Sequence, residues 1–321
     1  MSAAADPGGH AVGFAHVGVL YSSDEQLCDL LSPYLAEALR RQEHLLVVIS
    51  EPAERVLRDA LGEAADHVQW GGAGLSGNRL GRMFSSFGDY LAQWQRAGVP
   101  TRVIGEPGCD LSSDRLSQYL RYVSMAYEIY GAYGYPMLFL WDQRRYPPEV
   151  LAQVRAVHPR LLGGDGTIIN TEYRDPIDYL TANVTSAPAA PADLDLDVRL
   201  ESADGLAELR RRLRSWGTST ALSDGDTDDI VIAVDEIATN ALEHGQPPAR
   251  VRGWSTADAV FVRVDDHGRT GIPATTGYVR PPTDARRGRG IWMARHLADV
   301  LTTHNGPTGT TVALRFPRPL A

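Results

Sequence analysis

A carboxylate and a carboxamide lie four residues apart in the segment IVIAVDEIATNALEHG, residues 230–245. They belong to Glu236 and Asn240, and a spacing of four places two side chains one turn apart on the same face of a helix. A carboxylate can accept a proton, and an oxygen ligand beside it can hold a metal ion that binds phosphates. The alternative is a surface helix that presents a Glu and an Asn to water, and this segment alone leaves both interpretations open.

The helix that would carry this pair has an apolar face. Residues at helical spacing form that face: Ile230, Ala233, Ile237, Ala241 and Leu242. Gly245 follows directly, at a position where a left-handed residue often ends a helix. The sequence therefore predicts an amphipathic helix that ends at about Gly245.

Two strand-like runs follow this helix, at residues 249–254 and 259–264, and turn residues bound them. The second run leads into Asp266 and Gly268. An Asp at the end of a strand can accept a hydrogen bond from an adenine amino group, and a glycine lets the ring approach the backbone. The next stretch, residues 269–287, is rich in Gly, Pro and Thr and is predicted to be a mobile loop or lid.

Glycines recur where this loop gives way to a helix and again before the last strand. Gly288 and Gly290 precede a run with helical spacing at residues 292–300. Backbone N–H groups at the start of a helix can bind a phosphate, and a solvated basic loop is the alternative. Gly309, Thr310 and Thr311 then precede an alternating run at residues 312–316, which predicts a strand.

The four motifs, in this order, resemble those of the GHKL ATPase family over about residues 195–317. The subgroup they resemble most is the bacterial anti-sigma-factor serine kinases. The N-box of that subgroup, Glu-x-x-x-Asn-Ala-x-x-His, is matched by Glu236, Asn240, Ala241 and His244. The resemblance implies a GHKL (Bergerat) α/β sandwich with a mixed sheet, and ATP and Mg²⁺ as cofactors.

The resemblance also implies a role for each motif residue. Glu236 would be the general base that takes the proton from a substrate serine, and Asn240 would coordinate Mg²⁺. Asp266 would bind the adenine amino group. The other positions would complete the site, with Gly268 behind the ring, Gly288 and Gly290 along the phosphates, and Thr310 or Thr311 on the adenine side. Phosphoryl transfer depends mainly on charge neutralisation and positioning, so these groups would suffice.

Two positions depart from the family pattern. Thr270 stands where the G1 box often has a further Gly, with Gly271 one residue later, and Trp292 stands where the G2 box of histidine kinases has another Gly. These departures leave ATP binding better supported than turnover. Upstream of the motifs the sequence has no phosphoacceptor helix with a dimerisation pattern, which argues against a sensor histidine kinase.

The first half of the chain alternates between helical and strand-like patterns. Apolar strand runs are predicted at residues 17–20, 45–49, 68–70, 101–104 and 137–141, and helices at 24–41, 51–61, 81–97 and 111–130. Short apolar runs between helices favour a mostly parallel sheet in an α/β domain. A Pro/Ala-rich stretch at residues 186–193 is typical of a linker.

A glycine-rich stretch at residues 72–79 has the spacing of a P-loop, but Asn78 stands where the motif requires Lys. A glycine turn is therefore favoured there. The first half instead resembles the MEDS sensory domain, on segments 16–22, 102–107, 141–147 and 158–159. This resemblance implies a degenerate RecA-like sensor of small molecules, and Trp141 stands where a Cys or a small residue is expected.

We therefore expect a MEDS-like sensory domain at residues 12–183, a linker at 184–195 and a GHKL ATP-binding kinase domain at 196–317. Six polar residues of the first domain could line a sensory pocket: His16, Glu106, Glu128, Asp142, Arg145 and His158. The alternative for each of them is a structural hydrogen bond.

Composition limits the other possibilities. A net charge of −9 argues against direct nucleic-acid binding. The two cysteines lack metal-site spacing and are too few for a disulfide scaffold, which favours a reducing cytoplasm. The sequence contains no apolar run long enough to cross a bilayer, so we expect a cytoplasmic protein with no membrane contact.

The sequence thus predicts an anti-sigma-factor regulatory protein with ATP-dependent serine kinase activity toward an antagonist protein, gated by the N-terminal sensor domain. The expected partners are a sigma factor, an anti-sigma-factor antagonist and a small-molecule or other signal at the first domain, and homodimer formation is left open. One alternative is a catalytically silent, ATP-gated protein-binding module that regulates transcription. A metabolic enzyme in the first half is less favoured, because residues 1–185 show no clear nucleophile–base pair.

Overall fold

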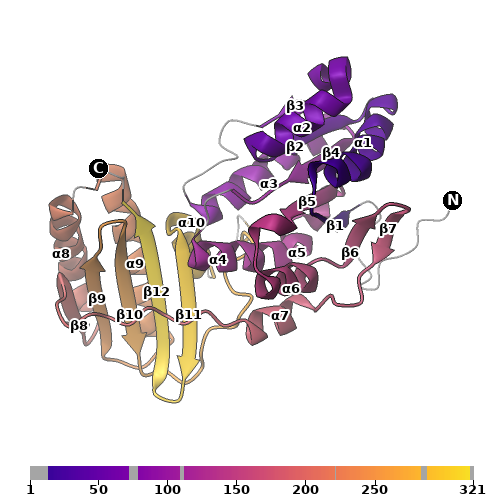
Figure 1. Cartoon of the computed structure of the whole chain (residues 1–321). Helices are drawn as coiled ribbons and strands as arrows, with labels where there is room; N and C mark the ends of the chain where they lie inside the picture. The colour runs from indigo at the N-terminus through magenta and orange to yellow at the C-terminus, as the bar shows by residue number, and fades with distance from the viewer. Residues whose placement is uncertain (1–13, 72–78, 109–111, 221, 283–287, 319–321) are drawn as a thin grey trace. The chain divides into compact units, whose positions relative to one another are not determined.

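The computed structural model describes residues 14–71, 79–108, 112–220, 222–282 and 288–318. The chain divides into two compact units (Figure 1). The first comprises Met1–Ser76 and Ser86–Tyr179, and the second comprises Gly77–Ser85 and Leu180–Ala321. The stretch expected as a linker, residues 184–195, falls within the second unit, and residues 77–85 join that unit from the first half of the chain.

The first unit is built on a seven-stranded sheet in the order β3-β2-β4-β5-β1-β6-β7. The strands are β1 (Ala15–Tyr21), β2 (His44–Val48), β3 (Gln69–Trp70), β4 (Thr101–Gly105), β5 (Pro136–Asp142), β6 (Arg160–Gly163) and β7 (Gly166–Ile169). Neighbouring strands pair in parallel except β6 and β7, which form an antiparallel hairpin at one edge. The mostly parallel sheet expected from the short apolar runs is therefore confirmed.

Helices lie between these strands in the chain: α1 (Asp24–Arg40), α2 (Glu51–Leu61), α3 (Leu80–Ala97), α4 (Ser113–Ser124), α5 (Ala126–Tyr130) and α6 (Pro148–Val157). A further helix, α7 (Pro176–Ala182), follows β7. Helices α1 and α2 bury their apolar faces, including Leu31 and Leu57, in one core with Leu138 and Leu140 of β5. Within the described residues, the structure has no helix whose length and apolar content would let it cross a membrane.

The single helix expected at residues 111–130 is wrong, because the chain breaks at Met125 into α4 and α5. Just before the break, the hydroxyl of Ser124 donates a hydrogen bond to the carbonyl oxygen of Arg121, at 2.8 Å. A serine hydroxyl that bonds to the local backbone competes with the helical hydrogen-bond ladder. The apolar spacing of the segment does not reveal this interruption.

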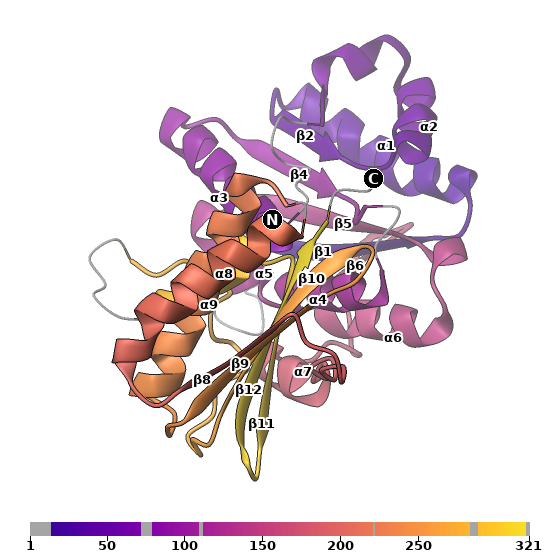
Figure 2. The ribbon, with the colours of Figure 1, turned by 90° about the vertical axis from the view of Figure 1, so that its left-hand side faces the viewer.

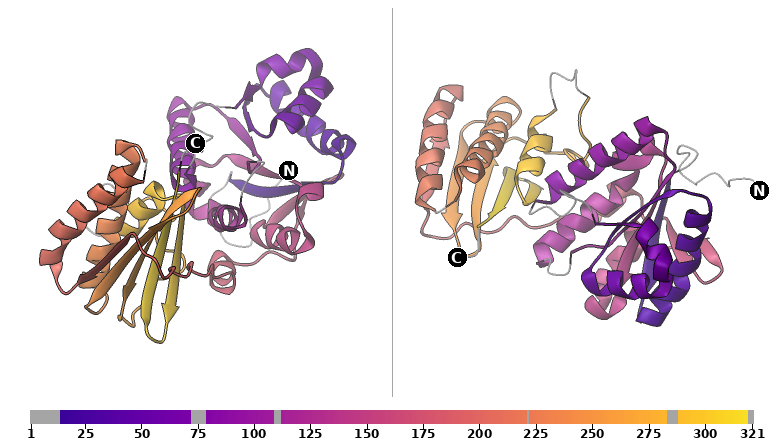
Figure 3. Two further views of the ribbon diagram at one scale, coloured as in Figure 1. Left: turned by 60° about the vertical axis from the view of Figure 1, so that its left-hand side comes forward. Right: turned by 90° about the horizontal axis from the view of Figure 1, so that it is seen from above.

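The second unit is a five-stranded sheet in the order β11-β12-β10-β9-β8. The strands are β8 (Leu196–Leu200), β9 (Ala249–Ser255), β10 (Ala259–Asp266), β11 (Val300–Gly306) and β12 (Gly309–Pro317), and the helices are α8 (Leu206–Ser219), α9 (Asp224–Glu243) and α10 (Gly290–Leu297). Figures 2 and 3 show α8 and α9 side by side along this sheet. Their buried residues form one core with the strands, which confirms the α/β sandwich.

Every pairing in this second sheet is antiparallel, so the expected mixed sheet is wrong. The connections explain the pattern. Two helices, α8 and α9, separate β8 from β9, and a pair of antiparallel helices returns the chain in the opposite direction. A single helix, α10, separates β10 from β11, but β12 lies between those two strands and prevents a parallel pairing.

Helix α9 begins six residues before the segment from which it was predicted. Ser223 caps it by accepting a hydrogen bond from the backbone N–H of Asp226, at 3.1 Å. Four of the five predicted apolar-face residues, Ile230, Ala233, Ile237 and Ala241, are at most 5% exposed. Their burial fixes the rotation of the helix and so sets where Glu236 and Asn240 point.

Candidate nucleotide-binding site

A pocket of about 540 Å³ lies in the second unit, where α9, the end of β10, the start of α10 and the start of β12 meet. Six of the eight site residues predicted from the sequence line it: Asn240, Asp266, Gly268, Gly288, Gly290 and Thr310. Glu236 and Thr311 are not among the lining residues. The structure therefore brings together residues that lie up to 70 positions apart in the chain.

Glu236 and Asn240 converge on the backbone of Gly290. A Cβ atom placed on Gly290 would lie 2.8 Å from Glu236 Oε2 and 2.8 Å from Asn240 Nδ2. A Cβ carbon does not approach a non-bonded oxygen or nitrogen so closely, so a side chain at this position would displace both groups. The glycine thus lets the first turn of α10 lie directly against the carboxylate and the carboxamide.

The Glu236 carboxyl group has a raised pKa. Burial is the main cause, and the negative charges of Asp235 and Glu243 add to it. Asp235 is itself paired with Arg210 on α8, whose Nε and Nη2 donate to its two oxygens at 2.7 and 3.0 Å. A carboxylate with a raised pKa accepts a proton more readily, which suits a general base.

Asp266 lies at the end of β10, between two glycines. Its Oδ1 accepts a hydrogen bond from the N–H of Gly268 at 2.6 Å. A Cβ atom on Gly245 would lie 2.5 Å from the carboxyl carbon of Asp266. The pKa of Asp266 is raised, chiefly by burial, and the N–H of Gly268 opposes the shift. The carboxylate is therefore half-buried at the pocket and held by a backbone hydrogen bond.

The expectation that Gly245 ends α9 in a left-handed conformation is wrong. Gly245 is not among the glycines with positive φ, and His244 is the C-terminal cap of the helix. The position requires glycine for a different reason, because a Cβ atom there would also lie 2.3 Å from the carbonyl oxygen of Ala241. What matters at this position is the close approach of α9 to the Asp266 carboxylate.

Thr310 and Thr311 point to opposite faces of β12, as neighbouring residues of a strand must. Thr310 pairs with Asp266 in the sheet register and lines the pocket. Thr311 pairs with Asp265, and its hydroxyl donates to Asp265 Oδ1 at 2.7 Å. Of the two threonines, the structure therefore places only Thr310 at the pocket.

Two further glycines are required by the backbone near Asp266. Gly271 has φ of +66°, and Gly309 has φ of +139°, both in the region that side chains rarely adopt. A Cβ atom on Gly309 would collide with the carbonyl oxygen of Asp266. Gly271 is the glycine that follows Thr270, so the shifted glycine of the G1 box meets a conformational need one residue later.

Two contacts that the sequence did not reveal hold the loop after β10. The side chain of Asn305 on β11 accepts from the N–H of Ile272 and donates to its carbonyl oxygen, both at 2.9 Å. Buried Arg295 on α10 donates to the carbonyl oxygen of Thr276 at 3.0 Å and lies 4.1 Å from the centre of the Tyr278 ring. In the sequence, the signal for this contact is that Arg295 occupies a position among the apolar residues of α10.

A mobile loop or lid is the expectation for residues 269–287. In its first part Asn305 bonds to Ile272 and Arg295 contacts Thr276 and Tyr278, and residues 283–287 lie outside the described part of the chain. Trp292, the other departure from the family pattern, stacks on His296 with ring centres 5.2 Å apart and does not line the pocket. This tryptophan therefore does not narrow the pocket.

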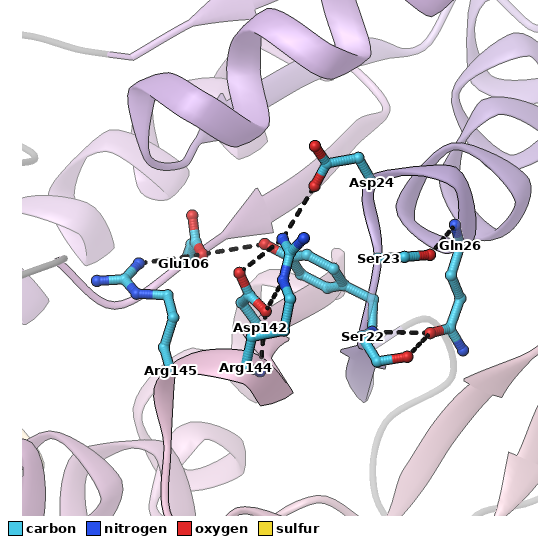
Figure 4. A network of polar contacts seen from close by, with 9 residues as sticks. Ser22, Ser23, Asp24, Gln26, Glu106, Asp142, Arg144 and Arg145 are labelled. Atoms are coloured by element: carbon cyan, nitrogen blue, oxygen red, sulfur yellow. Dashed lines mark hydrogen bonds and ion pairs between the residues drawn. The ribbon is translucent and has the colours of Figure 1, made fainter.

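The polar residues predicted for the first unit do not form a single site. Glu106, just after β4, accepts a hydrogen bond from the Tyr21 hydroxyl at 3.3 Å and from the Ser50 N–H at 2.8 Å. Arg145 Nη1 lies 3.8 Å from Glu106 Oε1 (Figure 4). One buried carboxylate thus connects the end of β1 with the segments that follow β2, β4 and β5. In this arrangement Glu106 serves as a structural hydrogen-bond partner.

Asp142 is the last residue of β5 and lies at the same end of the strands as Glu106. Arg144 bonds to Asp142 at 2.8 Å and to Asp24 at 2.9 Å (Figure 4). Strand β1 passes into α1 through only Ser22 and Ser23, and Ser23 caps the helix. Two residues are too few to wrap a phosphate as a P-loop does. The glycine-rich segment at 72–78 lies outside the described residues.

The remaining three candidates lie elsewhere in the first unit. His16 and His158 are buried and adjacent, with His158 Nδ1 2.8 Å from His16 Nε2. Trp141 Nε1 donates to His158 Nε2 at 2.8 Å, which gives the unexpected tryptophan a structural role. Burial lowers the pKa of His16 to about 3, so both rings are neutral near pH 7. Glu128 is exposed on α5.

Comparison with known proteins finds a family match in each half of the chain. The crystal structure of the RsbU and RsbW domains of Rv1364c from Mycobacterium tuberculosis is 23% identical with a TM-score of 0.30, covering 39% of this chain and 33% of that chain. The chain thus spans about a third of that protein. Residues 201–316 match the family described as histidine kinase-like ATPase domain, and residues 15–159 match MEDS, the methanogen/methylotroph, DcmR sensory domain. The chain therefore carries a histidine kinase-like ATPase domain, which implies ATP binding, after a MEDS domain.

Proposed function

We propose that the second unit binds Mg-ATP and transfers its terminal phosphate to a serine of a partner protein, as an anti-sigma-factor kinase does. The observation that carries this proposal is the convergence of Glu236 and Asn240 on the backbone of Gly290. A carboxylate, a carboxamide and the N–H groups at the start of a helix lie within one small region, where they would serve as base, metal ligand and phosphate-binding groups. These are the groups that phosphoryl transfer requires.

The pocket suits a nucleotide laid between two ends. At one end, the Asp266 carboxylate would accept the amino group of adenine, and Gly268 leaves space for the ring. At the other end, Gly288 and Gly290 line the pocket beside Asn240. The Asn240 side-chain oxygen would hold the magnesium ion, which supplies charge neutralisation when bound. A volume of about 540 Å³ is within the usual range for small-molecule sites.

The acceptor serine would reach Glu236 from outside the pocket. Glu236 contacts Gly290 but does not line the cavity, so its carboxylate lies at the margin of the phosphate end. A base in that position would take the proton of a hydroxyl presented by a protein. Phosphorylation would then add negative charge to the antagonist and weaken its docking, which frees the kinase unit to hold a sigma factor.

The N-terminal unit would gate this exchange as the sensor. Its family match is to a sensory domain, and the resemblance of the N-box Glu236–His244 to anti-sigma-factor kinases supports a regulatory target. The sensed signal would act at the first unit and change how the second unit binds ATP or its partners. The chain would thus join signal detection and partner choice in one polypeptide.

The test combines binding and transfer in the full chain. Mg-ATP affinity is measured by calorimetry, and serine phosphorylation of a candidate antagonist is measured by mass spectrometry, for wild type, Glu236→Gln and Asn240→Ala. We expect Glu236→Gln to bind Mg-ATP normally and lose transfer, and Asn240→Ala to lose binding. Asp228→Asn is the matched control, because Asp228 is an exposed carboxylate of the same helix α9 that does not line the pocket.

Two outcomes would contradict the proposal. Transfer by Glu236→Gln at the wild-type rate would remove Glu236 as the base. Tight Mg-ATP binding without transfer to any antagonist would instead support a catalytically silent, ATP-gated binding module.

A further inference from the structure

A short segment of the first half of the chain is part of the ATP-binding unit. Residues 77–85 belong to the second compact unit, whereas the chain on both sides of them, up to Ser76 and from Ser86, belongs to the first. Helix α3 extends from Leu80 to Ala97 without interruption. Its first six residues therefore lie in one unit, and the rest of the same helix lies in the other.

Arg79 fixes the start of this segment. Its side chain is 5% exposed, and its guanidinium forms ion pairs with both Asp226 and Asp229 of α9. The same guanidinium lies 5.8 Å from the centre of the Phe316 ring. A planar guanidinium can bond two carboxylates at once, which a lysine cannot do with the same geometry. A charge this deeply buried needs such partners, so the contact is specific.

The next turns of the segment contact α9 and α10. Arg82 Nη2 lies 2.7 Å from Asp229 Oδ2. A Cβ atom on Gly81 would lie 2.2 Å from the carbonyl oxygen of Arg295, so only glycine allows α3 to approach the end of α10. Ser85 Oγ lies 3.2 Å from His296 Nδ1. The pKa of His296 is lowered, first by burial and then by the charge of Arg82.

The two helices held by this segment are the two that form the phosphate end of the pocket. Asp229 and Glu236 are seven residues apart on α9, which places them two turns apart on one face of the helix. Helix α10 begins at Gly290, against Glu236 and Asn240, and ends beside Gly81. Residues 79–85 thus join the start of α9 to the end of α10.

We infer that residues 79–85 couple helix α3 to the ATP site, so that nucleotide binding in the second unit and the state of residues 86–97 are linked through Arg79 and Asp229. This inference rests on the proposed function, because it takes the pocket as an ATP site and adds the residues that would carry the gating. A change in the first unit moves residues 86–97, and the continuous helix passes that change to the contacts on α9 and α10. ATP binding acts back along the same route.

Hydrogen exchange in the full chain tests this coupling. Exchange is followed by mass spectrometry with and without a non-hydrolysable Mg-ATP analogue, in wild type and in Arg79→Met. At an analogue concentration of about 100 times Kd, amide hydrogens that exchange only when the nucleotide site opens should exchange about 100-fold more slowly. In wild type we expect this slowing in peptides from α9, α10 and residues 86–97. In Arg79→Met we expect it in α9 and α10 only.

Arg96→Met is the matched control, since Arg96 belongs to the same helix but lies in the first unit, exposed in the last turn, where it bonds to the carbonyl oxygen of Ala92. It should behave as wild type. If Arg79→Met does not fold, Asp229→Asn is used, because Arg79 then keeps its pairing with Asp226.

The possible results separate the coupling from the proposed function. Slowing in α9 and α10 of wild type that never reaches residues 86–97 would overturn the coupling and leave the ATP site standing. Slowing in residues 86–97 that survives in Arg79→Met would also overturn it. An absence of slowing anywhere, with no analogue binding by calorimetry, would overturn the ATP site and the coupling together.

Discussion

Two neighbouring aspartates at the end of β10 should respond in opposite ways to the same substitution. Asp266 faces the pocket, and its pKa is raised chiefly by burial. Asp265 faces the other side of the sheet, where hydrogen bonds from Arg263, Arg252 and Thr311 lower its pKa despite burial. Changing each to asparagine removes one charge at nearly constant volume, so the pair separates binding from folding.

For Asp266→Asn we expect weaker ATP binding without loss of stability. Adenine would lose a hydrogen bond to a charged acceptor, worth about 1.5–3 kcal/mol, which raises Kd by about 10- to 150-fold. A raised pKa means that the folded state disfavours the ionised carboxylate, so at pH 7 the charge costs folding free energy. Removing the charge should leave the free energy of unfolding of the nucleotide-free protein unchanged or higher.

For Asp265→Asn we expect the opposite result, namely a loss of stability without a change in ATP affinity. A lowered pKa contributes stability above the unfolded pKa, and that stability is lost as pH falls. The substitution should cost about 1–3 kcal/mol of unfolding free energy at pH 7 and leave ATP affinity unchanged. Calorimetric titration with ATP and urea unfolding without nucleotide measure both quantities. The reasoning fails if Asp266→Asn destabilises the free protein as much as Asp265→Asn does, or if both bind ATP equally well.

Three other expectations follow from the structure. Gly290→Ala should abolish phosphotransfer and weaken Mg-ATP binding, because its Cβ would displace Glu236 and Asn240; calorimetry and a transfer assay check this, and normal transfer would contradict it. The acid limb of the pH–rate profile should report Glu236 at a pKa above the ordinary value of about 4.3, and a limb at or below that value would contradict its role. His16 and His158 have lowered pKa values, so the folded state favours their neutral forms. Acidification from pH 6.5 to 5 should therefore lower the free energy of unfolding by about 2 kcal/mol per histidine. Unfolding curves for His158→Gln should show a smaller loss over the same pH range.

Local periodicity accounts for the parts of the fold that were predictable. The run at residues 51–61 is the helix α2 as expected, and the apolar run at 137–141 lies within β5. Helix α2 buries one face and β5 buries both, so the spacing of apolar residues in each segment indicates whether it is a helix or a strand. The run at residues 292–300 was misjudged because its apolar spacing continues past the end of α10 at Leu297, where Ala298 is already extended and Val300 begins β11.

Long-range contacts account for what the sequence could not predict at the site. The order of motifs indicated that Asn240, Asp266 and Gly290 would meet, and the pocket contains all three. The hold on the loop after β10 depends on Arg295 and Thr276, which lie 19 residues apart, and on a contact between Asn305 and Ile272 over 33 residues. Nothing in the local pattern of either segment specifies its distant partner.

The path of α3 also matters for how the chain can be divided. A fragment cut at the Pro/Ala-rich stretch would keep all of β8–β12 but lose residues 79–85. Asp226 and Asp229 would then lose the buried Arg79, and Phe316 would lose the guanidinium over its ring. The boundary between the two family matches therefore differs from the boundary between the two compact units. Excision of the ATPase domain should therefore yield a less stable body than the one present in the whole chain.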